Sequence, residues 1–211
     1  MLETAFTLWE APVTWLEVIA FALALGCVAC NILEIHWGWP LAIASSALYG
    51  WLFFASRLYG EAGLQLFFIA TAAWGWWQWL FGRRASGAAL AVASLTRFGL
   101  ARALAAWAFG WGAIGLFLAT LTDSEVPYFD AFPTAGSLLG QVLLGRKFIE
   151  NWPVWIVVNA ASVVLFASRG LWLTTVLYAV FLVMALAGWW RWRRVRDAIA
   201  PAKAVAPQAA T

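Results

Sequence analysis

The sequence predicts an all-α integral membrane protein with seven transmembrane helices, from its composition, its apolar segments and an internal repeat. Of its 211 residues, 64% are hydrophobic and 11% are charged, and the mean hydropathy is +0.82. A soluble domain carries about 25% charged residues. A water-soluble fold of this size could not bury so much apolar surface. Because no polar stretch is long enough to form a soluble domain, we expect residues 1–211 to form a single transmembrane domain.

Seven segments approach the roughly 20 apolar residues that a membrane-spanning helix needs. They are Val13–Leu33, Trp39–Ala55, Ala62–Phe81, Phe98–Leu121, Thr134–Leu144, Trp152–Ser168 and Leu171–Trp190. The fifth is short and rich in glycine, so we expect it to pack inside the bundle. The tail from about residue 198 is rich in alanine and proline, and we expect it to be disordered.

The basic residues divide unevenly between the two sides that seven spans define. One side takes Arg83, Arg84, Arg97, Arg102, Arg146, Lys147, Arg191, Arg193, Arg194, Arg196 and Lys203, and the other takes Arg57 and Arg169. Cytoplasmic loops carry the excess of lysine and arginine. The predicted N-terminus is therefore outside and the C-terminus cytoplasmic. Because these charges lie at segment ends, nucleic acid is not an expected partner.

Three short motifs recur at nearly one offset. Trp39-Pro40 returns as Trp152-Pro153 and Gly75-Trp-Trp-Gln-Trp79 as Gly188-Trp-Trp-Arg-Trp192, both 113 residues later, while Ala55-Ser-Arg57 returns as Ala167-Ser-Arg169, 112 residues later. This pattern predicts two parallel three-helix repeats, at about 13–82 and 130–192, joined by a linker helix at about 98–121. Parallel repeats place a binding site at their interface near mid-membrane and let one half rock against the other.

The sixth span carries the clearest candidate site. Asn151 is predicted to cap this helix, and Pro153 sits in its first turn, where a missing N–H costs little. Trp152, Trp155 and Asn159 are spaced i, i+3 and i+7, which puts them on one helical face. Indole faces suit flat rings, and cationic rings best of all. We interpret this face as the wall of a pocket.

Other uncharged polar side chains also lie inside predicted spans. They are Asn31, Ser45, Ser46, Tyr49, Gln65, Thr71, Gln141, Thr174 and Tyr178. Such groups must find partners, either across helix contacts or in a wet cavity. Each one alone could serve helix packing, but the whole set favours a polar-lined cavity. Ser46 matches Asn159 across the repeat.

Several chemistries have no support in the sequence. Cys27 and Cys30 form a C-x-x-C inside an apolar helix without a further ligand, and we interpret them as packing residues. His36 is the only histidine, and no catalytic triad or phosphate-binding loop is present. Acidic residues lie near span ends, whereas ion-coupled transport normally needs buried ionisable groups. We expect a passive transporter, not an enzyme, with no metal and no cofactor.

The second half reads Leu144-Gly-Arg-Lys-x-x-Glu-Asn-Trp-x-x-Trp-x-x-x-Asn159, and the first holds Tyr49-Gly50, Gln65 and Gly-Trp-Trp-Gln-Trp79. Over about residues 15–192 this resembles the PnuC-type vitamin transporters. The resemblance implies a three-plus-one-plus-three arrangement like that of the SWEET sugar transporters. It also implies a homotrimer in the bacterial inner membrane, facilitated diffusion of nicotinamide riboside, and trapping by cytoplasmic phosphorylation.

The resemblance implies site residues position by position. Trp152, Trp155 and Asn159 match the family motif, and Lys147 matches its basic position. Gln141, Gln65, Tyr49 and Tyr178 lie in corresponding helices. The first half departs from the pattern, with Trp-Trp-Gln-Trp where many members have Tyr-Gly-Trp-Tyr-Gln-Trp. Thiamine and riboflavin therefore stay open as substrates. A small membrane enzyme acting on a lipid and an assembly subunit are the more distant alternatives.

Overall fold

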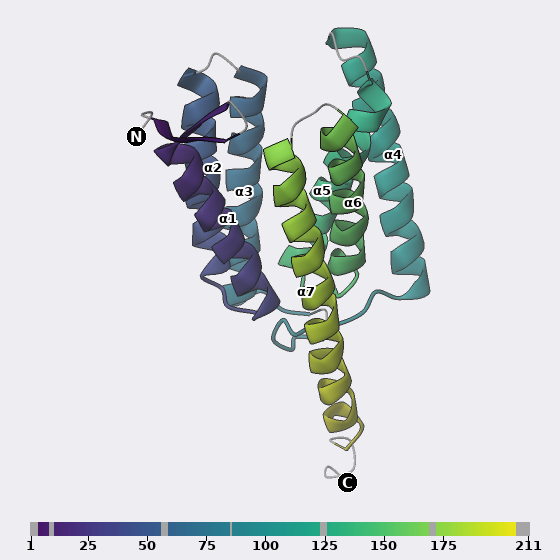
Figure 1. Ribbon diagram of the computed structural model, residues 1–211. Coiled ribbons are helices and arrows are strands. Elements are labelled where there is room, and N and C mark those ends of the chain that lie inside the picture. Colours follow the sequence, from purple (N-terminus) through teal and green to yellow (C-terminus); the bar gives the residue numbers. More distant parts are fainter. Residues whose placement is uncertain are drawn as a thin grey trace. The chain divides into compact units, whose positions relative to one another are not determined.

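The computed structural model describes residues 4–8, 11–55, 59–84, 86–122, 126–168 and 172–205. Within these residues the elements are β1 (Thr4–Leu8), β2 (Ala11–Thr14), α1 (Trp15–Ile32), α2 (Gly38–Ala55), α3 (Tyr59–Phe81), α4 (Arg97–Leu121), α5 (Pro127–Gly145), α6 (Asn151–Ser168) and α7 (Trp172–Val205) (Figure 1). The predicted seven-helix membrane fold is confirmed.

One element was not expected. β1 and β2 form an antiparallel hairpin before α1. The two strands are rich in threonine and also contain Phe6 and Val13, and β-branched and aromatic residues favour extended backbone. The apolar run that we took as the start of the first span therefore begins as a strand, and α1 starts at Trp15.

The fifth helix is longer than its apolar segment suggested. We expected it near Thr134–Leu144, but α5 begins at Pro127 and contains Pro133 in its second turn. Pro127 suits the first turn of a helix, because an N–H there would have no partner within the helix. Asp130, also in the first turn, complements the positive end of the helix dipole. Residues 127–133, which precede the predicted span, therefore form the first turns of α5.

The seventh helix also runs further than expected. α7 continues to Val205, beyond the residue near 198 where we placed a disordered tail. Three helical stretches are long and apolar enough to cross a bilayer by themselves within the described residues, namely Arg97–Leu121, Asn151–Ser168 and Thr174–Ala198. On α4, Phe98 is 73% exposed and Phe109 is 79% exposed. Apolar side chains left so open suit contact with lipid.

The helices gather into two compact units, Met1–Ala89 and Leu90–Thr211. In the first unit α2 packs against both α1 and α3. In the second unit α6 packs against both α5 and α7, and α4 packs against α5 (Figure 1). The helix that we expected to link the repeats is therefore packed into the second unit.

The sequence repeat is visible in the element boundaries. α1 ends at Ile32 and α5 at Gly145, α2 spans Gly38–Ala55 and α6 spans Asn151–Ser168, and α3 begins at Tyr59 and α7 at Trp172. Each of these pairs is 113 residues apart, which is the offset of the tryptophan motifs. The helices α1–α3 and α5–α7 are thus matched in order, and α2 and α6 are equal in length, whereas α7 has 34 residues and α3 has 23. The parallel relation of the two triplets stays a prediction.

Each unit contains the same ring-on-glycine contact. In the first unit a Cβ on Gly75 would come within 2.4 Å of the Trp39 ring, and in the second a Cβ on Gly188 would come within 2.5 Å of the Trp152 ring. Trp39 meets Trp79 edge to face at 5.5 Å between ring centroids, and Trp152 meets Trp192 likewise at 5.4 Å. We conclude that these tryptophans lock the second helix of each triplet to the third.

Candidate functional site

The candidate site begins at the turn between α5 and α6. Lys147 adopts φ +51°, and two hydrogen bonds close the turn, from Lys147 N–H to Leu144 O (2.9 Å) and from Phe148 N–H to Leu143 O (2.9 Å). This is a Schellman cap, which usually places glycine at the left-handed position. A residue with a side chain costs about 1 kcal/mol or more there. The turn keeps Lys147 despite that cost.

The segment before α4 fastens this turn. Ala93 N–H donates to Lys147 O at 3.1 Å, and Ile149 N–H donates to Ala93 O at 2.9 Å. Leu95 N–H donates to the Glu150 carboxylate at 3.0 Å. The other Glu150 oxygen, Oε2, is buried with no hydrogen-bond partner among the described residues. Glu150 thus binds the start of α4 to the start of α6.

Asn151 does not cap α6 as we predicted. The first helical hydrogen bond runs from Val154 N–H to Glu150 O, so Glu150 occupies the capping position. Asn151 is fully buried, and its Nδ2 donates back to Phe148 O at 2.7 Å. Its Oδ1 has no partner within the described residues. Asn151 therefore stabilises the turn and leaves the helix end to backbone hydrogen bonds.

Trp152 faces α7. Its side chain is 2% exposed, because the ring lies on Gly188 and against the edge of Trp192. Its indole N–H has no hydrogen-bond partner among the described residues. In this conformation the Trp152 ring packs against α7, and a contact between Trp152 and substrate stays a prediction.

Trp155 faces α5 instead. A Cβ on Gly140 would come within 2.9 Å of the Trp155 ring, so the indole rests on bare backbone. The ring packs against the core residues Leu143, Val154 and Val158 and remains half-buried. Trp155 and Trp152 therefore share a helical face but contact different neighbours.

Asn159 lies one turn beyond Trp155 on α6 and is 4% exposed. None of the hydrogen bonds seen among the described residues involves its side chain. The Asn159 amide is not among the fully buried side-chain groups that lack a hydrogen-bond partner in the described part of the chain. A contact between Asn159 and a bound molecule stays a prediction.

The other predicted site residues fall into two groups. In the second unit Gln141 follows Gly140 on α5 and is half-buried, and the Tyr178 ring on α7 lies tilted against the Phe166 ring of α6, with 5.1 Å between the ring centroids. In the first unit Gln65 of α3 lies against Gly50 of α2, where a Cβ would be 3.3 Å from its own Cβ. Tyr49 precedes Gly50. Of the predicted site residues, the described contacts of the second unit place Trp155 at the α5–α6 contact, through Gly140.

Sequence reasoning missed Trp107. This α4 indole donates to Phe132 O at 3.2 Å and stacks on the Phe132 ring at 5.1 Å. It also covers Gly136, one turn before Gly140 on α5. Two indoles from different helices therefore cover neighbouring glycines of α5. Glycines spaced i and i+4 in a helix were the available signal, because each leaves room for a ring.

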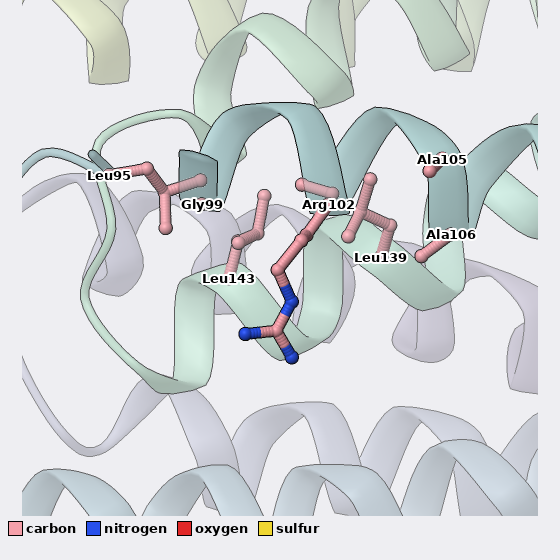
Figure 2. A pocket seen from close by; sticks show the side chains of 8 residues that line it. Leu95, Gly99, Arg102, Ala105, Ala106, Leu139 and Leu143 are labelled. Carbon is pink, nitrogen blue, oxygen red and sulfur yellow. The ribbon is translucent and has the colours of Figure 1, made fainter. Parts of the chain in front are cut away.

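A surface hollow with a volume of 490 Å³ lies between α4 and α5. Its lining is apolar except for one arginine and consists of Leu95, Gly99, Arg102, Ala103, Ala105, Ala106, Leu139 and Leu143. Figure 2 shows the Arg102 guanidinium extending away from α4. None of the predicted site residues lines this hollow, but two of their neighbours do, namely Leu143 of the core cluster that Trp155 packs against and Leu95, which donates to Glu150.

The described residues contain no group of three or more His, Cys, Asp or Glu side chains that could hold a metal ion. Cys27 and Cys30 are free thiols, and Asn31 Nδ2 donates to Cys27 Sγ at 3.5 Å. The cysteines therefore take part in the packing of α1.

Comparison with known proteins identifies relatives over most of the chain. The family model described as nicotinamide mononucleotide transporter matches residues 14–194. The chain is 26% identical over 206 residues to the nicotinamide riboside transporter PnuC of Escherichia coli (strain K12), covering 85% of each chain. It is 29% identical over 192 residues to the riboflavin/roseoflavin transporter RibM of Streptomyces davaonensis, covering 88% of this chain and 89% of that one.

A solved structure has a similar fold. The crystal structure of the vitamin B3 transporter PnuC superposes with a TM-score of 0.69 at 24% identity. The match covers 87% of this chain and 83% of that chain. At this identity the likeness establishes the fold.

Proposed function

The chain belongs to the nicotinamide mononucleotide transporter family and is similar to proteins named as vitamin transporters, and on that premise we propose that it carries nicotinamide riboside across a membrane by facilitated diffusion. The observation that carries the proposal is the half-buried Trp155 ring next to the buried Asn159 amide on α6. A pyridinium ring stacks on an indole as a cation–π pair. The Asn159 amide can both donate to and accept from a carboxamide or a ribose hydroxyl.

The unphosphorylated nucleoside suits these residues better than a nucleotide. A phosphate needs cationic or multiple N–H donors. Trp155, Asn159 and Gln141 are uncharged, and Lys147 lies in the turn before α6. A nucleoside phosphorylated after entry would then bind poorly and stay inside. This difference supports uptake with metabolic trapping.

Two features of the sequence complete the proposal. The excess of basic residues on one side favours a cytoplasmic C-terminus and an outside N-terminus in a bacterial inner membrane. The family resemblance favours a homotrimer. Both are properties of the intact protein in its membrane, and cross-linking of single-cysteine variants in cells tests both.

Riboflavin is the second candidate substrate, because RibM is as similar to this chain as PnuC is. The isoalloxazine ring is neutral and larger than a pyridinium. It gains aromatic stacking on Trp155, worth about 0.5–1.5 kcal/mol, but not the cation–π attraction. Thiamine, which carries a cationic ring, is the third.

Binding to purified protein in lipid nanodiscs tests the site. We expect Trp155→Ala and Asn159→Ala each to weaken nicotinamide riboside binding about tenfold or more, because each removes an interaction worth roughly 1–2 kcal/mol. Trp51→Ala is the matched control, since Trp51 on α2 is 63% exposed. Retained affinity for nicotinamide riboside, riboflavin and thiamine in both site variants would show that the site lies elsewhere.

Uptake into liposomes tests the mechanism. With facilitated diffusion, labelled nicotinamide riboside should reach equal concentrations inside and outside, with or without a proton or sodium gradient. Accumulation above the outside concentration when a gradient is imposed would contradict facilitated diffusion while leaving the binding result intact.

A further inference from the structure

Two arginines near the end of the membrane-spanning part of α7 are stacked on tryptophans one turn earlier. The Arg194 guanidinium lies 4.1 Å from the centre of the Trp190 ring, and the Arg193 guanidinium lies 5.4 Å from the Trp189 ring. Both distances are within the roughly 6 Å that defines a cation–π contact. Arg193, Arg194 and Trp190 are exposed.

Stacking occupies the face of a guanidinium and leaves its edge available. The edge carries the N–H donors that bind phosphate oxygens in a bidentate manner. Among the described residues no hydrogen bond to Arg191, Arg193 or Arg194 is seen. Arg196 differs, because its guanidinium donates to Asp197 Oδ1 at 2.8 Å and to Ser94 Oγ at 3.1 Å. Three arginines therefore keep their charge and donors for an outside partner.

The position along α7 indicates what that partner is. From Trp172 to Trp190 the helix is roughly 27 Å long at about 1.5 Å per residue. A bilayer has a hydrocarbon core of about 30 Å, so Trp189 and Trp190 fall at its boundary and the arginines at the level of the headgroups. Helical side chains lean toward the N-terminus of their helix, which at this end of α7 is the direction of the hydrocarbon core. The stacked guanidinium groups are thus held at phosphate depth.

We propose that Trp189, Trp190, Arg191, Arg193 and Arg194, which we call the arginine–tryptophan surface, bind the headgroup phosphates of anionic phospholipids. The tryptophan rings hold the guanidinium groups in place and reduce the entropy lost on binding. Three positive charges without an acidic partner among the described residues supply the attraction to an anionic headgroup.

The end of α3 lacks this surface although it shares the tryptophan motif. Trp76 and Trp77 match Trp189 and Trp190, but Leu80 and Phe81 stand where α7 has Arg193 and Arg194. Trp77 is 55% exposed, close to the 65% of Trp190. The α3 tryptophans therefore provide a matched comparison that has the rings without the charges.

The test measures binding of dioleoyl phosphatidylglycerol and dioleoyl phosphatidylcholine to the purified full-length protein by native mass spectrometry. The wild type should prefer phosphatidylglycerol. Arg193→Gln with Arg194→Gln should lower that affinity about 25-fold, since each basic residue near an anionic headgroup contributes a factor of about five. Trp190→Leu should lower it several-fold, whereas Trp77→Leu should leave it unchanged.

A charge-matched control separates a defined surface from net charge. Arg83→Gln with Arg84→Gln removes two charges at the end of α3, where Arg83 donates to Gly87 O at 3.0 Å instead of stacking. An equal loss of phosphatidylglycerol affinity in this control, or an unchanged affinity in the Arg193/Arg194 variant, would overturn the proposal. Circular dichroism melting in detergent confirms that every variant is folded before its binding is compared.

Discussion

The two units have the same frame but different side chains at matching positions. Helix ends, the ring-on-glycine contact and the left-handed turn residue recur at an offset of 113, with Glu34 at φ +59° matching Lys147 at φ +51°. The side chains on α2 and α6 differ at other matching positions, since Ala42 of α2 matches Trp155 of α6 and Ser46 matches Asn159. The repeated positions are those that hold helices together. Of the unrepeated positions, Trp155 lies at the α5–α6 contact, where we propose that substrate binds.

The matching turns between α1 and α2 and between α5 and α6 show the same division. Ile35 N–H donates to Cys30 O at 2.8 Å as Phe148 N–H donates to Leu143 O at 2.9 Å. At the next matching positions the side chains diverge, since Trp37 is 60% exposed whereas Glu150 binds Leu95 N–H. The backbone frame of the turn is duplicated, while the attachment to the segment before α4 belongs to the second unit.

The largest expected effect tests the shared frame. Trp39→Ala and Trp152→Ala should each destabilise the protein by about 3–5 kcal/mol, because each removes a buried ring and leaves a cavity. Thermal unfolding in detergent measures both, with Trp51→Ala as the exposed control. A stable Trp152→Ala variant that had lost only substrate affinity would break the comparison and make Trp152 a ligand contact.

Gly75→Ala and Gly188→Ala should each cost about 1–3 kcal/mol, because the added methyl would overlap the tryptophan ring that covers it. Gly112 on α4 is the matched control, since nothing lies within 4 Å of a Cβ placed there. Gly112→Ala should leave the melting temperature equal or slightly higher. Similar losses at Gly75 and Gly188 would sharpen the equivalence of the two units.

Glu150→Ala should destabilise the second unit by about 1.5–3 kcal/mol, because it removes a hydrogen bond to a charged group and leaves Leu95 N–H without that partner. Glu150→Gln keeps an acceptor and should lose less. Trp37→Ala, at the matching position of the first unit, should change stability by about 0.5 kcal/mol or less. Hydrogen exchange at Leu95 gives a local measurement of the same effect.

The smallest effect concerns the left-handed turn residues. Lys147→Gly and Glu34→Gly relieve backbone strain and should each stabilise the protein by at most about 1 kcal/mol. The gain is reduced by the free energy of any contacts that the removed side chains make. If Lys147 contributes to the site, Lys147→Gly should also weaken nicotinamide riboside binding. Unchanged binding together with a higher melting temperature would remove Lys147 from the site.

The sequence alone predicted the features that depend on local pattern. Apolar length and the recurrence of Trp39-Pro40 as Trp152-Pro153 placed α2 and α6 within a residue or two of their observed bounds. Each of these signals depends only on residues that are close together in the sequence. The same local reasoning missed the β1–β2 hairpin and shortened α5, because short polar or proline-containing stretches resemble loops.

Only the tertiary structure decided which of the two α6 tryptophans is buried and which is half-buried. Spacing put Trp152 and Trp155 on one face of α6, but Trp152 is buried on Gly188 and Trp155 is half-buried on Gly140. The burial of each ring depends on where a neighbouring helix has a glycine, which lacks a Cβ, and on how that helix packs. The same packing brought Trp107 of α4 to Gly136. Helical periodicity sets the direction of a side chain, whereas the helix that it meets is set by how the whole chain packs.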